Sequence, residues 1–140
     1  MVVDERSAVG TILTTEWVDA AGKLVAPISW PNRTFTPPNG PWVKVIILGG
    51  DSFRISIGGD TNVTRHTGIL MLQIFDKVGN GDLTVRTMAD SLSALFRDRV
   101  TAGGTNEFIR FRSPYTPHDG VDGAWFQMSC AVPYARDAMM

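Results

Sequence analysis

The chain has 140 residues, of which 44% are hydrophobic and 19% charged, and its formal net charge is −1. This length suits one domain with a buried core, and the apolar content excludes an intrinsically disordered chain. The near-neutral charge excludes a general attraction to nucleic acid or to an anionic membrane. We therefore expect a single domain spanning residues 1–140.

Short apolar runs and a single cysteine narrow the class of protein further. The run Val43–Leu48 is too short to cross a bilayer as a helix, so we expect no membrane partner. The first residues lack the basic-then-apolar pattern of a signal peptide. Cys130 excludes an intrachain disulfide, and its apolar neighbours predict a buried, unreactive thiol.

The first predicted element is a helix over Val3–Val18, whose apolar residues recur near helical spacing. Asp4 is placed to cap its N-terminus. The segment 31–41 contains four prolines, which exclude a helix and a central strand alike. We interpret it as an ordered, extended surface segment anchored by Trp30 and Phe35, and the alternative is a disordered linker.

Three strands are predicted next. Trp42–Leu48 is an apolar run that ends at Gly49–Asp51, which we interpret as a hairpin turn. Ser52–Ile57 alternates polar residues with apolar ones, beginning with Phe53, and this pattern indicates a half-buried strand. Arg65–Phe75 has a continuous apolar middle and is predicted to be central in the sheet.

A second helix is predicted from its N-cap at Asp82 to a stop at Gly103–Gly104. Arg97 and Arg99 would then lie near its C-terminal end, where positive charge is favourable. An apolar stripe at helical spacing predicts the buried face. It comprises Val85, Met88, Ala89, Leu92, Leu95 and Phe96.

Two more strands close the chain. They are predicted over Glu107–Arg112 and Ala124–Tyr134, with a loop over Ser113–Gly123 between them, and Pro133 is expected to end the pairing. The order of elements predicts an α+β domain. We expect a mixed, mostly antiparallel sheet with two helices packed on one face.

The sequence gives little sign of catalysis. His66 and His118 lie in different segments, without the closely spaced partners that metal sites show. His118 with Asp119 could form half of a catalytic or metal pair, although an exposed loop histidine is the commoner case. Nucleophile and phosphate-loop motifs are absent from the sequence. We therefore expect no enzyme, no cofactor and no metal.

Arginines and loop aromatics point instead to protein contacts. Four arginines lie at polar-facing or terminal positions of the predicted strands, namely Arg54, Arg65, Arg110 and Arg112. They suit either a solvated sheet face or a positive patch that pairs with a neighbouring subunit. The aromatic candidates for subunit contacts are Trp30, Phe35 and Tyr115. The predicted helices lack a basic recognition face, so we expect no specific nucleic-acid partner.

Taken in order, these segments resemble a known family. A strand of the Pro-Trp-Val-Lys-Val-Ile-Ile-Leu-Gly-Gly type lies at Pro41–Gly50, and Arg65–Phe75 follows it. The helix at Met88–Arg97 and the closing segment Gly123–Met128 complete the pattern. In this order of segments, over roughly residues 5–135, the chain resembles the phage tail-terminator-like family of small tail completion proteins.

The resemblance implies a structural role in a virion tail, after synthesis in the bacterial cytoplasm. Members of the family form a hexameric ring that caps the tail tube, stops its polymerisation and meets the head-tail neck. The implied partners are five further copies, the tail-tube protein and a neck or connector protein, with the genome passing through the ring lumen. We expect tube or neck contacts in the loops 58–64 and 113–123, notably at Asp60, Asn62 and His118.

Other functions remain open at the level of sequence. The chain could be another neck or head-completion protein, or a tail-tube subunit that polymerises by itself. A small enzyme or ligand-binding domain would use His118 and Asp119. A nucleic-acid-binding module would use the strands that contain arginine.

Overall fold

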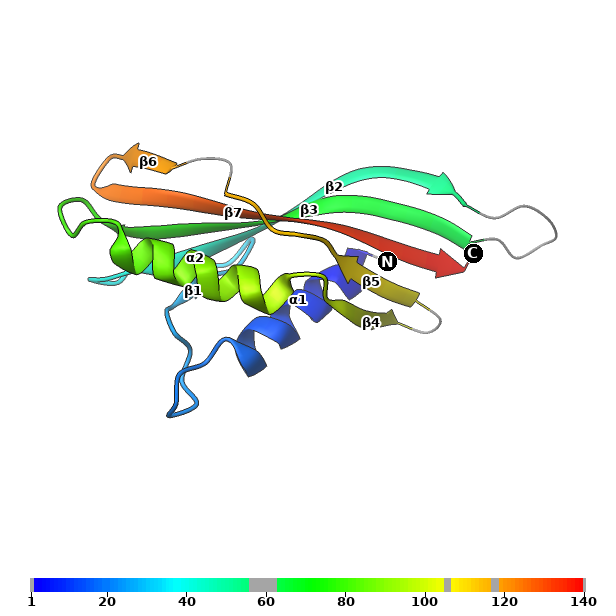
Figure 1. Cartoon of the computed structure of the whole chain (residues 1–140), viewed down its shortest axis with the longest axis horizontal. Helices are drawn as coiled ribbons and strands as arrows, with labels where there is room; N and C mark the ends of the chain where they lie inside the picture. The colour runs from blue at the N-terminus through cyan, green and yellow to red at the C-terminus, as the bar shows by residue number, and fades with distance from the viewer. Residues whose placement is uncertain (1, 56–62, 105–106, 117–118, 140) are drawn as a thin grey trace.

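The computed structural model describes residues 2–55, 63–104, 107–116 and 119–139 (Figure 1). The described elements, in chain order, are α1 (Val2–Glu16), β1 (Ile28–Ser29), β2 (Trp42–Arg54), β3 (Val63–Lys77), α2 (Leu83–Phe96), β4 (Val100–Gly104), β5 (Glu107–Phe111), β6 (Asp119–Asp122) and β7 (Trp125–Met139). The predicted α+β class is confirmed. The predicted turn over residues 58–62 and the residue His118 lie outside the described residues.

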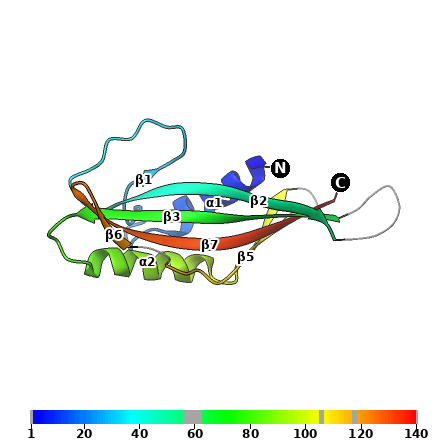
Figure 2. The same ribbon diagram turned by 90° about the horizontal axis from the view of Figure 1, so that it is seen from above.

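In the described part of the chain the strands form one mixed, mostly antiparallel sheet, in the order β1-β2-β3-β7-β5-β4, with β6 paired to β7. Among the described strands, only β1 and β2 run parallel. Figure 1 shows β2, β3 and β7 as three long twisted strands that run side by side across the molecule. Figure 2 shows α2 alongside one half of these strands. As predicted, β3 is central, because β2 and β7 pair with its two edges.

The hydrophobic core is built from alternate residues of the long strands. One cross-strand row joins Val43, Ile74 and Met128, and the next joins Val45, Leu72 and Cys130. All six are buried. Because side chains alternate across a strand, these residues share a side of the sheet. Burying each aliphatic side chain of this kind contributes roughly 1.5–3 kcal/mol.

Both helices contribute to this core. The predicted apolar residues of α1 are buried, namely Val9, Ile12, Leu13 and Trp17. The indole Nε1 of Trp17 donates to Ser91 Oγ at 3.0 Å, which ties the end of α1 to α2. The helix begins at Val2, so Asp4 lies inside its first turn and the predicted cap at Asp4 is wrong.

The second helix is shorter than predicted. The apolar stripe is confirmed, since Val85, Met88, Ala89, Leu92 and Phe96 are all buried. The helix ends at Phe96, and residues 100–104 form β4 instead of a last helical turn. The chain turns at Asp98, whose φ of 52° lies in the left-handed region.

The charged residues at the two ends of this helix were also predicted from the sequence, and the structure shows their contacts. Asp82 is the N-cap residue as predicted, but its side chain makes no cap hydrogen bond. Its carboxylate instead accepts a hydrogen bond from Arg86 Nε at 2.6 Å. Arg97 is the C-cap residue, so it lies near the C-terminal end of the helix as predicted. Arg99 follows beyond the helix and pairs with Glu16 of α1.

The two predicted strands around Gly49–Asp51 are one continuous strand. β2 advances three residues from Gly49 to Ser52, while β3 advances only two from Gly68 to His66, so β2 contains a β-bulge. The extra residue reverses the side to which later side chains point. Phe53 therefore lies opposite Arg65 and is 48% exposed. The predicted hairpin turn and the predicted burial of Phe53 are both wrong.

The last strand runs beyond Pro133, contrary to prediction. Pro133 lies opposite Ile69 of β3, and its carbonyl accepts from the Arg112 amide at 2.8 Å. Because the amide and carbonyl of one strand residue point the same way, the missing N–H of Pro133 faces away from β3. The long β3–β7 ladder therefore loses no hydrogen bond at this position. The predicted loop 113–123 also contains a strand, β6, which forms a hairpin with β7.

Candidate functional site

The structure brings three of the predicted arginines toward one face at one end of the sheet. Arg65 lies opposite Asp137 of β7, and its Nε and Nη2 atoms donate to the two carboxylate oxygens at 2.8 and 3.1 Å. Arg110 of β5 is exposed and lies opposite Ala135, two residues before Asp137 on β7. Arg112 follows Arg110 on the same side of the chain. Arg54 is exposed at the end of β2, opposite Thr64.

Asp137 supplies a negative charge to this cluster of arginines. The hydrogen bonds from Arg65 are the main cause that lowers its pKa below the ordinary value, and the charges of Arg65 and Arg110 act in the same direction. Two exposed phenylalanines, Phe53 and Phe108, flank the ion pair in the same cross-strand row. The surface is therefore both basic and apolar, as protein interfaces often are.

The aromatic candidates divide into two kinds. Phe35 packs on Trp42 with 5.0 Å between ring centroids, and Trp42 stacks on Phe75 at 4.2 Å. Trp30 packs against the core, and the Arg6 guanidinium lies 3.9 Å above its ring. Both candidates are thus partly engaged within the chain, which supports the predicted ordered segment. Tyr115 is different, because it is 49% exposed.

The backbone around Tyr115 is well held. Its amide donates to the Ala131 carbonyl at 2.9 Å, and the Ala131 amide donates back at 2.7 Å. This two-way bridge fixes the loop after β5 against β7. Tyr115 is therefore a side chain presented from a rigid support. Asp60, Asn62 and His118 lie outside the described residues, so their predicted roles remain predictions.

A buried polar network joins the two ends of the chain. Tyr134 Oη donates to Glu5 Oε2 at 2.8 Å, and Arg136 Nε donates to Glu5 Oε1 at 3.1 Å. All three residues are buried. Burial, and then the hydrogen bond to the Glu5 carboxylate, raise the pKa of Tyr134, so the phenol stays a protonated donor. Sequence reasoning missed this network because its members lie about 130 positions apart and match no motif.

Gly68 makes room for this network. A Cβ atom at Gly68 would lie 2.5 Å from both the Leu48 carbonyl oxygen and Tyr134 Oη. Any side chain there would push against the backbone of β2 and against the phenol. The glycine therefore allows Tyr134 to cross beneath β3 and reach Glu5.

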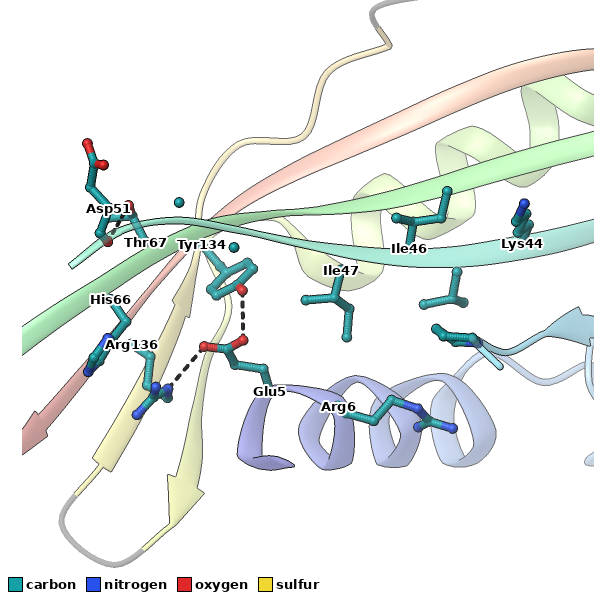
Figure 3. A pocket seen from close by; sticks show the side chains of 14 residues that line it. Glu5, Arg6, Lys44, Ile46, Ile47, Asp51, His66, Thr67, Tyr134 and Arg136 are labelled. Atoms are coloured by element: carbon teal, nitrogen blue, oxygen red, sulfur yellow. Dashed lines mark hydrogen bonds and ion pairs between the residues drawn. The ribbon is translucent and has the colours of Figure 1, made fainter. Parts of the chain in front are cut away.

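A groove of about 560 Å³ lies beside this network (Figure 3). One wall is the strand segment 44–51 of β2, and the opposite wall is the first turns of α1 with Glu5 and Arg6. Figure 3 shows Ile47 pointing into the space between strand and helix, with Tyr134 and Arg136 at one end. Lys44 lies at the other end.

The wall formed by β2 is a sheet edge that is mostly unpaired. In the described structure β1 pairs only with Val43 and Lys44 of this edge. The Val43 amide donates outward to the Pro27 carbonyl at 3.0 Å. Because peptide groups alternate along a strand, the amides of Val45 and Ile47 point outward as well. The sequence pattern of this strand did not indicate which edge would be free.

The cysteine and the carboxylates are further candidates for chemistry, beginning with Cys130. Cys130 is buried, its Sγ lies 3.5 Å from Ser93 Oγ, and burial raises the pKa of its thiol. Among the described residues, no group of three His, Cys, Asp or Glu side chains could hold a metal ion. Within the same residues, neither helix is long and apolar enough to cross a membrane.

Comparisons with known proteins identify a family and a similar fold. A family model described as phage tail terminator protein matches residues 6–134, which is nearly the whole chain. A solved structure with 19% sequence identity superposes with a TM-score of 0.73, covering 97% of this chain and 95% of that chain. At this identity the likeness shows the fold alone. The comparison with curated proteins found no match.

The chain therefore belongs to the phage tail terminator protein family. The resemblance drawn from the order of its segments is confirmed. Membership places the protein in the tail of a bacteriophage virion, in a structural role and in association with other tail proteins.

Proposed function

We propose that this protein is a tail terminator whose copies close into a ring of six at the end of the tail tube. The ring ends polymerisation of the tube and joins the tail to the head-tail neck. The observation that supports this proposal most strongly is the family match over residues 6–134. The genome passes through the ring lumen without sequence-specific contacts. The protein is made in the host cytoplasm, acts without a cofactor and catalyses no reaction.

The surfaces of the domain suit this role. We propose that α1 and α2 share one face of β2, β3 and β7, which leaves the opposite face for neighbours. Part of that opposite face is basic and apolar, with exposed Arg110 beside the Arg65–Asp137 pair. Tyr115 and Phe53 add exposed aromatic surface. Aromatic and arginine side chains are the residue types that contribute most to binding at protein interfaces.

The direct test combines the protein with polymerising tail-tube subunits and measures tube length by electron microscopy. A terminator shortens the tubes in proportion to its concentration and appears as a cap at one end. Tubes of unchanged length and without caps would contradict the proposal. Open filaments formed by this protein alone would identify a tube subunit instead.

A further inference from the structure

We infer that the free edge of β2 receives strand β6 of a second copy, so that the sheet continues from one subunit to the next. This inference rests on the proposed ring and names the contact that closes it. Strand addition to an open sheet edge is a common mode of protein recognition, because the unpaired backbone groups supply hydrogen bonds.

The backbone of β2 is prepared for such pairing. The outward peptide groups of Val45 and Ile47 have no strand beside them in the described structure. The segment before the bulge at Gly49 is regular, and its pairing with β3 is uninterrupted from Trp42 to Gly49. The groove of about 560 Å³ beside it leaves room for the side chains of an added strand. A free edge of this length is otherwise a liability for aggregation.

The charges of the groove select an acidic strand. Arg6 and Lys44 line the groove, and neither has an ion pair among the described residues. Of the two acids that line it, Glu5 already accepts hydrogen bonds from Tyr134 and Arg136. The groove therefore retains two cations for an incoming segment, against the single remaining carboxylate of Asp51.

Strand β6 has the complementary composition. Its sequence, Asp-Gly-Val-Asp, has two negative charges and no positive one. Val121 between them is 66% exposed, an unusual position for a valine in a strand. β6 pairs with β7 only, so its other edge is also free in the described structure. An added β6 would cover Val121 and bring negative charge next to the basic groove.

The geometry of this pairing fits a closed ring. β2 and β6 are different strands, so their contact is heterologous, and repeated heterologous contacts form a ring when the rotation per subunit closes. A contact between two copies of β2 would instead be two-fold and would stop at a dimer. In the described structure β4 also ends the sheet with a free edge, and Val100 on it is 58% exposed. β4 is therefore the rival strand.

Cysteine cross-linking distinguishes these contacts. The full chain with Lys44→Cys and Val121→Cys together should, on mild oxidation, give a ladder of covalent oligomers that ends at the size of the ring. Cys130 is buried and should not take part. The matched control is Lys44→Cys with Val100→Cys, which tests β4 and should give no ladder. Lys44→Cys alone tests the two-fold contact and should give no covalent dimer.

Charge exchange provides a second readout. Lys44→Glu should reduce the fraction of protein in the ring, which light scattering measures. Each 1.4 kcal/mol of contact free energy that is lost weakens the affinity between subunits by roughly tenfold. Adding Asp119→Lys, two residues from Val121 on the same strand, to that variant should restore the ring. Lys23→Glu, on an exposed turn, should leave it unchanged.

A wild-type ring that gives no ladder with the Val121 pair, or gives one with the Val100 pair, would overturn the β6 contact and leave the proposed function standing. A wild-type protein that stays monomeric both alone and with tail tubes would contradict the proposed function as well.

Discussion

At the scale of single residues, the buried carboxylate of Glu5 ties the N-terminal helix to β7. It is 8% exposed and accepts hydrogen bonds from two partners on β7. Removing one member of a buried ion pair leaves the other charged group without compensation, which typically costs 3–5 kcal/mol. The network therefore fixes α1 to the sheet beside the proposed subunit contact.

We expect Glu5→Ala to lower the free energy of unfolding by about 3–5 kcal/mol, because the buried Arg136 and Tyr134 both lose the carboxylate that accepts their hydrogen bonds. The matched control is Glu16→Ala, which removes a more exposed partner of Arg99 and should cost much less, because solvent screens this pair. Urea titrations of both variants measure the difference. Equal losses in the two variants would show that the Glu5 network adds nothing beyond a surface pair.

A second residue-scale prediction concerns Gly68. Gly68→Ala should destabilise the fold by about 1–3 kcal/mol, the usual cost of forcing extra atoms into a packed interior. The new methyl group would meet the Leu48 carbonyl oxygen and Tyr134 Oη. Gly49→Ala is the control, since a Cβ there meets no atom within 4 Å. Thermal unfolding midpoints that fall equally for both variants would contradict the steric explanation.

The ion pair of Arg65 and Asp137 predicts a dependence of stability on pH. Arg65 lowers the pKa of Asp137 in the folded state, so the carboxylate stabilises the fold above its unfolded pKa of about 3.9. This stabilisation is lost as the pH falls through the lowered folded value. Asp137→Asn should therefore melt below the wild type at pH 7, and the gap should shrink below about pH 4. A gap that is constant with pH would contradict the assignment.

At the scale of elements, sequence patterns predicted the parts whose cause is local. The stripe from Val85 to Phe96 gave the buried face of α2, and the apolar middle of Arg65–Phe75 gave the central strand β3. Errors arose where tertiary contacts decide. The bulge after Gly49 exists because β2 pairs with β3 across it, and no local signal shows the extra residue.

The same explanation covers the remaining differences. Pro133 is tolerated within β7 because its position in the ladder requires no N–H toward β3. The candidate site was predicted only in part for the same reason. Arg65 and Arg110 could be recognised as polar-facing strand residues, but their shared partner Asp137 lay beyond the predicted end of the last strand. The groove between α1 and β2 has no sequence signature at all.

The second helix is expected to stabilise the domain chiefly through its apolar stripe. Leu92→Ala should cost about 2–5 kcal/mol, because Leu92 is fully buried and the deletion leaves a cavity. Leu83→Ala, at a position that is 78% exposed on the same helix, should change stability by less than about 0.5 kcal/mol. Chemical denaturation distinguishes the two. A small loss at Leu92 would mean that α2 is not part of the cooperative core.

At the scale of the whole molecule, the domain combines a rigid core with surfaces that one copy cannot satisfy. The core couples both helices to the three long strands. The edge of β2, the edge of β6 and the basic end of the sheet remain available for contacts. A subunit with two different complementary edges is suited to closed, head-to-tail assembly. The family to which the chain belongs places the protein in a phage tail.

The proposed ring is tested most directly by the mass of the purified protein in solution, measured by light scattering over a concentration series, with and without tail tubes. We predict a discrete particle of six subunits, formed by the protein alone or on contact with the tubes. A protein that remains monomeric under both conditions, or that grows into filaments of indefinite length, would contradict the proposed ring.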